Sequence, residues 1–219
     1  MELNNYDRSA SFYDFLSRLV FFKAQVHAQI EQLRFIPPSS KVLIVGGGTG
    51  WILDELSKIY PNGLTITYVE ISGKMVEKAR KRNMGQNQVS FIQSGIESFA
   101  VTESFDVIQT AFLFDNFSIP RIREVYDKLD SLLHPGGLWL FTDFHYEPEN
   151  SPFWQGIILK TMYLFFGAIA HVEAKNLTSM VPYFAAARYQ IKVQKAFYRN
   201  FIQAIVFQKP VKSLPSSQI

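Results

Sequence analysis

The sequence predicts a doubly wound α/β domain, in which a mainly parallel sheet carries helices on both faces. Short apolar runs typical of buried parallel strands, the first at 41–45, alternate with helix-like segments. A glycine-rich turn, 46–50, follows the first run directly. Two β-rich runs near the end, 189–197 and 201–208, are joined by only three residues, which predicts an antiparallel hairpin at one edge of the sheet.

Each expected element has a local reason. The strands are short runs of β-forming residues bounded by turns, and we place them at 41–45, 64–69, 89–93, 105–110 and 138–142. The helices carry apolar residues at three- and four-residue steps, and we place them at 11–34, 51–60, 72–82 and 120–133. Ser72 suits the N-cap of the third helix, and Pro120 suits the first turn of the fourth. A His-Pro-Gly-Gly turn at 134–137 separates that helix from the next strand.

The last third of the chain is different in character. An aromatic helix is expected at 153–166, and a second helix at 177–187, kinked by Pro182. The residues 210–219 form an expected frayed tail.

Composition limits the class of protein. The chain has 219 residues, of which 47% are hydrophobic and 19% charged, which is enough for one domain with a sizeable core. Cysteine is absent, which excludes disulfides and thiolate chemistry. The N-terminal residues lack the pattern of a signal peptide, and the most apolar stretch, 156–172, contains Lys160 and falls short of the ~20 apolar residues of a spanning helix. We therefore expect a cytoplasmic protein.

Charge is unevenly distributed along the chain. From Ser151 onward eight basic residues face one acid, Glu173, so this part carries +7 and the remainder −4 of the net +3. A solvated basic face is the ordinary interpretation. The alternative is attraction of an anionic acceptor, or a weak peripheral contact with an anionic membrane surface.

The glycine turn after the first strand is the central functional signal, because glycines let a backbone approach a ligand closely. A P-loop requires Lys-Ser/Thr after the last glycine, and Trp51-Ile52 excludes it. A dinucleotide fingerprint requires a glycine where Trp51 stands, which disfavours NAD. Glu70 closes the next strand, twenty residues past Gly50, where an acid can accept hydrogen bonds from both hydroxyls of a ribose.

With these residues in view, the chain resembles the class I S-adenosylmethionine-dependent methyltransferases of the small-molecule type. The resemblance covers roughly 6–209 and rests on segments in family order: VLIVGGGTG, YVEISGKMVEKAR, VSFIQSGIESF, FDVIQTAFLFDNF and LLHPGGLWLFTDF. It implies S-adenosylmethionine as cofactor and a Rossmann-like, seven-stranded, mainly parallel sheet with an antiparallel last strand. The implied organisation is a single domain, 1–209, divided into a helical lid, a cofactor-binding core, a helical acceptor-side segment and a terminal hairpin at 1–40, 41–145, 146–187 and 188–209.

The resemblance also assigns roles to individual residues. The methionine end of the cofactor would lie on the glycine loop, the ribose on Glu70, and the sulfonium near the end of the fourth strand. The implied cofactor-binding residues are Tyr6, Tyr13, Gly46, Gly48, Gly50, Glu70, Ile71, Met75, Gly95, Ile96, Thr110, Ala111 and Phe112. Tyr6 and Tyr13 resemble lid tyrosines of quinone-type and other small-molecule methyltransferases, although ordinary helix packing explains them equally well.

Two positions depart from the family pattern. Ile44 stands where relatives often carry an acid that helps order the loop and the cofactor's amino group, so those contacts must come from elsewhere. Ile44 with the triple glycine also resembles aminopropyl-transferring synthases, but their paired catalytic acids are not apparent. Gly95 stands where many relatives carry an aspartate that bonds the adenine amine.

The acceptor side is less well determined by the sequence. The candidate catalytic residues are Asp115, Asp143 and His145, all near the carboxyl ends of the fourth and fifth strands, with Tyr146 a further candidate for acceptor contact. Solvated or capping roles explain each of them equally well. An aromatic group in the last third would indicate an apolar or aromatic acceptor if it lines a pocket; its members are Phe153, Trp154, Tyr163, Phe165 and Phe166.

Other functional classes fit less well. The four histidines are scattered, so no metal site is expected, and no motif or recognition module typical of nucleic-acid methylation is present. The alternatives to a small-molecule methyltransferase are a non-catalytic S-adenosylmethionine-binding protein, an NAD-binding oxidoreductase and an aminopropyltransferase. The sequence specifies neither the methylated atom nor an oligomeric state.

Overall fold

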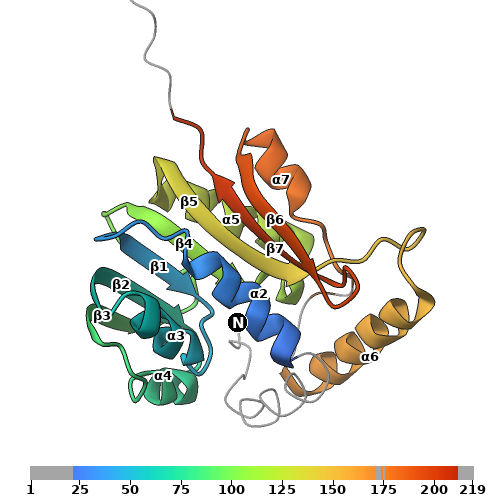
Figure 1. Ribbon diagram of the computed structural model, residues 1–219. Helices are drawn as coiled ribbons and strands as arrows, with labels where there is room; N and C mark the ends of the chain where they lie inside the picture. Colours follow the sequence, from blue (N-terminus) through green and yellow to red (C-terminus); the bar gives the residue numbers. More distant parts are fainter. Residues whose placement is uncertain (1–21, 171–173, 175, 212–219) are drawn as a thin grey trace, which may run out of the picture.

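The computed structural model describes residues 22–170, 174 and 176–211 and contains a seven-stranded sheet with helices on both faces (Figure 1). The strand order is β3-β2-β1-β4-β5-β7-β6. The strands are β1 (Lys41–Val45), β2 (Asn62–Glu70), β3 (Gln86–Gln93), β4 (Phe105–Ala111), β5 (Leu133–Phe144), β6 (Gln190–Phe197) and β7 (Ile202–Gln208). The helices are α2 (Phe22–Leu33), α3 (Trp51–Ile59), α4 (Gly73–Ala79), the 3₁₀ turn η1 (Phe114–Asn116), α5 (Ile119–Leu132), α6 (Phe153–Ala170) and α7 (Val181–Ala186).

The topology confirms the predicted fold class. β1 pairs in parallel with β2 and β4, β2 with β3, and β4 with β5, whereas β7 runs antiparallel to both β5 and β6. The predicted hairpin is therefore present, and it turns at Tyr198, Arg199 and Asn200, which all have positive φ. The sheet is mainly parallel with an antiparallel last strand, as the resemblance implies.

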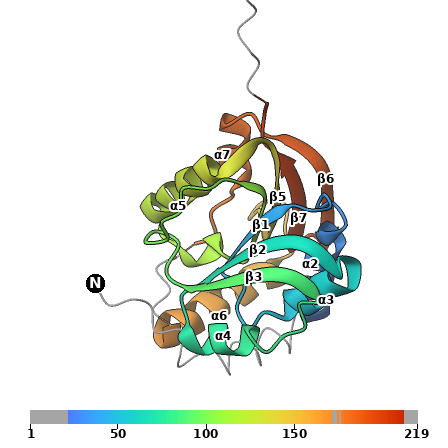
Figure 2. The same cartoon turned by 90° about the vertical axis from the view of Figure 1, so that its left-hand side faces the viewer.

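Two apolar cores hold the helices against the sheet. On one face α5 and α7 pack around Trp139, whose ring stacks on Tyr126 with centroids 5.5 Å apart. On the other face α2 and α3 cover the apolar side chains of β1, among them Ile44. Figure 2 shows the two helical layers on either side of the sheet, with α6 beyond the ends of the strands. Among the described residues, no helix combines the length and apolar character needed to cross a membrane.

Several predicted elements needed correction. The helix expected at 177–187 is only α7, because Pro182 lies in its first turn, where the missing N–H costs nothing, instead of kinking a longer helix. The turn expected at 134–137 is incorporated into β5, whose pairing with β4 shifts register between Phe105 and Val107. The helix expected at 72–82 ends earlier, at Ala79. Of the helix expected at 11–34, only α2 lies within the described residues.

Candidate cofactor and active site

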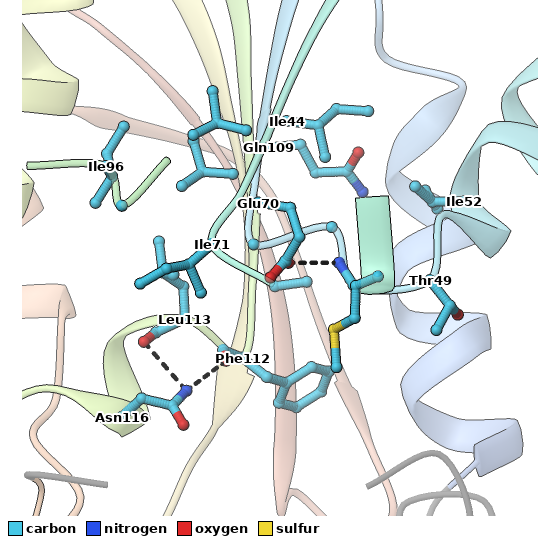
Figure 3. A pocket seen from close by; sticks show the side chains of 18 of the residues that line it. Ile44, Thr49, Ile52, Glu70, Ile71, Ile96, Gln109, Phe112, Leu113 and Asn116 are labelled. Atoms are coloured by element: carbon cyan, nitrogen blue, oxygen red, sulfur yellow. Dashed lines mark hydrogen bonds between the residues drawn. The ribbon is translucent and has the colours of Figure 1, made fainter. Parts of the chain in front are cut away.

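A pocket opens beside the carboxyl ends of β1, β2 and β4, where the order of the strands reverses between β1 and β4. Ligands of open α/β sheets bind at such switch points. Its wall combines the glycine loop, the end of β2, the segment after β4 and one side of α2. The lining residues used below are Gly46, Gly47, Gly48, Thr49, Glu70, Ile71, Met75, Gly95, Ile96, Gln109, Ala111, Phe112, Leu113, Asn116, Phe117 and Arg121 (Figure 3).

The glycine loop needs its glycines for two different reasons, lack of space and backbone conformation. A Cβ atom at Gly47 would lie 2.5 Å from the ring of Tyr68, whose hydroxyl donates a hydrogen bond of 2.8 Å to the carbonyl of Gly48. Gly48 has φ +61°, a conformation that side chains disfavour, and a Cβ atom there would make only ordinary contact with Met75, at 3.9 Å. The loop therefore presents bare backbone to the pocket.

Glu70 joins the loop to the end of β2. The side chain is 5% exposed, and its two carboxylate oxygens accept hydrogen bonds from the backbone N–H groups of Gly48, at 3.0 Å, and Ser72, at 2.9 Å (Figure 3). Ser72 in turn caps α4, because its hydroxyl accepts a hydrogen bond from the N–H of Met75. A carboxylate has about four acceptor positions and can also accept hydrogen bonds from hydroxyl groups such as those of a ribose.

The side of the pocket expected to hold the adenine is apolar with a charged rim. Ile71, Gly95 and Ile96 all line it, as the resemblance implies. A Cβ atom at Gly95 would lie 3.0 Å from Glu97, which forms an ion pair with Arg121. Sequence reasoning missed this ion pair, because its partners lie 24 residues apart and no motif joins them.

The segment after β4 is held in an unusual backbone conformation. Phe112 has φ +51°, which costs energy for a residue with a side chain, and its N–H donates to the carbonyl of Thr142 at 2.9 Å. The Asn116 amide donates to the carbonyls of Phe112 and Leu113, at 2.9 and 3.3 Å (Figure 3). These bonds stabilise the turn that places Phe112, Leu113 and Phe117 along the pocket wall.

The three candidate catalytic residues lie at the expected strand ends, but none of them lines the pocket. Burial raises the pKa of Asp115 to about 7. Burial also raises the pKa of Asp143, which is 4% exposed, and the neighbouring charge of Asp115 raises it further. The imidazole of His145 lies 3.4 Å from the carboxylate of Glu147, near the surface. Their catalytic roles stay predictions.

The other predicted residues divide into three groups. Gly46, Gly48, Glu70, Ile71, Met75, Gly95, Ile96, Ala111 and Phe112 line the pocket together. Gly50 and Thr110 do not line the pocket. Gly50 is the N-cap residue of α3, and the Thr110 hydroxyl accepts a hydrogen bond from the indole of Trp139. Tyr6 and Tyr13 lie outside the described residues.

The predicted aromatic group does not line the pocket where it is described. Phe153 is 80% exposed, and the ring of Trp154 packs edge-on against Tyr198 and Phe201. The side chains of Tyr163, Phe165 and Phe166 lie outside the description. Among the described residues, no group of three His, Asp or Glu side chains is arranged to hold a metal ion.

The fold and the pocket define a protein of the Rossmann-like methyltransferase class, and the donor set fits S-adenosylmethionine. The loop offers uncovered backbone, Glu70 offers acceptors for a ribose, and Ile71 and Ile96 offer an apolar surface for a base.

Comparison with known proteins identifies a methyltransferase domain within the chain. Residues 42–137 match the model of a methyltransferase domain. The chain is 29% identical over 143 residues to a malonyl-[acyl-carrier protein] O-methyltransferase of Ilyobacter polytropus, covering 64% of this chain and 52% of the relative. It is 28% identical over 153 residues to a ubiquinone/menaquinone biosynthesis C-methyltransferase of Geotalea daltonii, covering 64% of this chain and 61% of the relative. The chain thus matches only about half to three fifths of these relatives' length.

Solved structures share the fold at low identity. The N-methyltransferase NodS from Bradyrhizobium japonicum, in complex with S-adenosylhomocysteine, superposes with a TM-score of 0.63 at 17% identity, covering 86% of this chain and 88% of that one. The match over residues 42–137 shows a methyltransferase domain of the S-adenosylmethionine-dependent type, and the solved structures show the same fold.

Proposed function

We propose that this protein transfers a methyl group from S-adenosylmethionine to a small acceptor that is apolar or aromatic. The observation that carries the proposal is the position of Glu70, whose carboxylate is bound to the glycine loop and faces the same pocket as Ile71 and Ile96. Residues 1–209 would act as one domain in the cytoplasm, with 1–40 as its lid.

The apolar wall supports an apolar or aromatic acceptor. Phe112, Leu113 and Phe117 border the pocket after β4, and the ring of Phe112 lies 4.9 Å from that of Phe144. The matched relatives are named as a malonyl-[acyl-carrier protein] O-methyltransferase and a ubiquinone/menaquinone biosynthesis C-methyltransferase. These names leave both O- and C-methylation open for this chain.

The demands on the chain's own residues are modest. S-adenosylmethionine supplies a methyl group that is already activated on a sulfonium. The chain must align the acceptor and exclude water, which the buried apolar wall after β4 would do. If the acceptor loses a proton, the candidate bases are Asp115, Asp143 and His145. Burial raises the pKa of Asp115 to about 7, which suits a general base near neutral pH.

Calorimetric titration with S-adenosylmethionine and, separately, NAD tests the proposal. We expect micromolar binding of S-adenosylmethionine, no binding of NAD, and at least tenfold weaker binding in Glu70→Ala, because a buried acceptor of two hydroxyls is lost. Glu77→Ala is the matched control, since Glu77 is exposed on α4 and should leave affinity unchanged. Binding of NAD, or no binding of either compound, would overturn the proposal.

An acceptor screen then separates catalysis from cofactor storage. We expect turnover with an apolar or aromatic small molecule and its loss, at unchanged cofactor affinity, in Asp143→Asn. Tight cofactor binding with no turnover across a broad panel of O-, N- and C-acceptors would instead support the non-catalytic alternative.

A weak peripheral membrane contact is part of the same proposal. Lys192, Lys195 and Arg199 lie on the edge strand β6 and its turn, although Lys195 already pairs with Glu31 of α2. Sedimentation with anionic vesicles at low salt should retain the protein, and retention should fall as salt rises. If the protein did not sediment with the vesicles at low salt, the proposed membrane contact would be wrong.

A further inference from the structure

A buried glutamine on β4 has a side-chain oxygen that nothing in the described chain satisfies. Gln109 is 2% exposed in the middle of an apolar sheet, and its Oε1 atom has no hydrogen-bond partner among the described residues. Most buried side-chain oxygens in proteins are hydrogen-bonded, so such an exception requires an explanation. Because Gln109 also lines the pocket, a bound ligand is the simplest partner.

The register of the sheet places Gln109 beside the base of the glycine loop. Gln109 pairs with Ile44 of β1, so the two side chains lie on the same face, toward α3. Figure 3 shows the amide of Gln109 between Ile44 and Ile52, on the α3 side of Glu70. Neither isoleucine side chain can form a hydrogen bond, so Gln109 is the polar one of these three side chains.

The neighbouring start of α3 offers hydrogen-bond donors, whereas the Gln109 oxygen is an acceptor. Gly50 occupies its N-cap position without a side-chain hydrogen bond, so the first N–H groups of this nine-residue helix are not capped by a side chain. N–H groups at a helix N-terminus attract anions. Thr49, Trp51 and Ile52, at this helix start, line the same pocket.

A ligand that carries both a negative and a positive charge could bind the start of α3 and the Gln109 oxygen together. The methionine end of S-adenosylmethionine carries a carboxylate and an ammonium on one carbon atom, and the start of α3 suits only the carboxylate. Rotation about the last side-chain bond of Gln109 exchanges its oxygen and nitrogen, which turns the oxygen toward the pocket.

We propose that the Gln109 side-chain oxygen accepts a hydrogen bond from the cofactor's ammonium group, and that Gln109 thereby selects ligands that carry an amino-acid end. This inference rests on the proposed function, since it assigns one contact within the same pocket. It makes Gln109 a specificity-determining residue in place of an acid on β1.

Two ligands and one near-isosteric substitution test the contact. S-adenosylhomocysteine is compared with its analogue in which hydrogen replaces the amino group, by calorimetry on wild-type protein and on Gln109→Met. Methionine keeps the shape of glutamine but accepts no strong hydrogen bond. We expect Gln109→Met to weaken S-adenosylhomocysteine binding about tenfold to a hundredfold and to change binding of the amino-free analogue less than threefold.

Gln155→Met is the matched control. Gln155 is also buried, its Oε1 atom also lacks a partner among the described residues, and it lies on α6 outside the pocket wall. This variant should bind both ligands as the wild type does. The melting temperature of ligand-free Gln109→Met should not fall below that of the wild type, because no hydrogen bond within the described chain is lost.

The outcomes separate this inference from the proposed function. If the wild type binds neither ligand, the proposed function fails. If the wild type binds S-adenosylhomocysteine and Gln109→Met weakens both ligands equally, or neither, the ammonium contact is wrong while the function stands.

Discussion

At the scale of single residues, a buried carboxyl group and a half-buried one lie where β5 and β4 end. Asp143 on β5 and Asp115 on η1 both have pKa values raised by burial, and the value of Asp115 is about 7. The backbone N–H of Phe144 donates to Asp143 at 2.8 Å, which opposes the rise without cancelling it. The folded protein therefore holds protons here that the unfolded chain, with aspartate pKa values near ~3.9, has lost.

This pair makes stability depend on pH. Where the folded state binds more protons than the unfolded state, the free energy of unfolding falls as pH rises, here from about pH 4 to about pH 7. Asp143→Asn removes one of the two ionisable groups while keeping an oxygen for the N–H of Phe144. We expect the variant to match the wild type below about pH 4 and to gain stability relative to it as pH rises, with a clear difference at about pH 8, measured by guanidinium denaturation.

Asp127→Asn is the control for that measurement, since Asp127 is exposed on α5. It should follow the pH profile of the wild type. Parallel profiles for the wild type and Asp143→Asn would show that Asp143 ionises normally.

A pair of glycines separates backbone strain from ligand contact. Gly48 has φ +61° and Gly63 has φ +91°, and a Cβ atom would come no closer than 3.9 Å and 4.0 Å to other atoms at these positions. Each alanine variant should therefore lose a similar stability, about 1–2 kcal/mol. Only Gly48 lines the pocket, so Gly48→Ala alone should weaken S-adenosylhomocysteine binding, by tenfold or more in calorimetry. Equal affinities in both variants would contradict the assigned role of the loop.

At the scale of elements, one polar side chain fastens α2 to the sheet. Gln32 is 2% exposed; its amide nitrogen donates to the carbonyls of Phe141 and Ile205 at 2.8 and 3.0 Å, and its oxygen accepts from the hydroxyl of Thr142 at 2.8 Å. Phe141 and Ile205 are paired residues of β5 and β7. The helix that lines one side of the pocket is thus bound to the antiparallel strands.

A double-mutant cycle tests this attachment. Gln32→Leu should cost about 2–4 kcal/mol in free energy of unfolding, because it removes three hydrogen bonds and leaves the Thr142 hydroxyl buried without a partner. Thr142→Val should cost less. The double variant should be more stable than the sum of the single losses predicts, since neither orphan then remains, with a coupling of roughly 1 kcal/mol in urea denaturation. Strict additivity would mean that the two side chains act independently.

The sequence predicted elements well where the signal is local. The apolar run of β1, the N-cap Ser72 and the three-residue hairpin turn each carry their own cause, and the structure has all three. The start of α7 was misplaced because Pro182 fits both a helix start and a kink, and only packing distinguishes them. The extent of β5 depends on pairing with β4 and β7, which no local pattern specifies.

The site divides in the same way. The glycine loop and Glu70 could be found from spacing alone, because the loop and the next strand end are consecutive in the chain. Gln109 and the ion pair of Arg121 with Glu97 could not, since their positions follow from strand register and helix packing. An amide residue within a buried strand is nevertheless a usable signal: Gln109 follows Val107 and Ile108 directly in β4.

At the scale of the whole molecule, the pocket is lined by segments that lie far apart in the sequence. The loop after β1, the end of β2, the turn after β4 and the side of α2 meet only when the sheet has its native order. A ligand in this pocket therefore binds the folded state and has no comparable site on the unfolded chain.

Ligand binding should accordingly stabilise the entire domain. At a hundredfold excess over its dissociation constant, S-adenosylhomocysteine should add about 2.7 kcal/mol, which raises the melting temperature by roughly 5–10 °C for a chain of this size. Differential scanning fluorimetry measures the shift, and NAD at the same concentration should produce none. Glu70→Ala and Gly48→Ala should each need a higher ligand concentration for the same shift, whereas Gly63→Ala should start from a lower melting temperature and gain the full increment. If S-adenosylhomocysteine bound by calorimetry without raising the melting temperature, its site could not depend on the assembled strand order, and a site formed by a local segment such as the loop and β2 alone would replace the pocket described above.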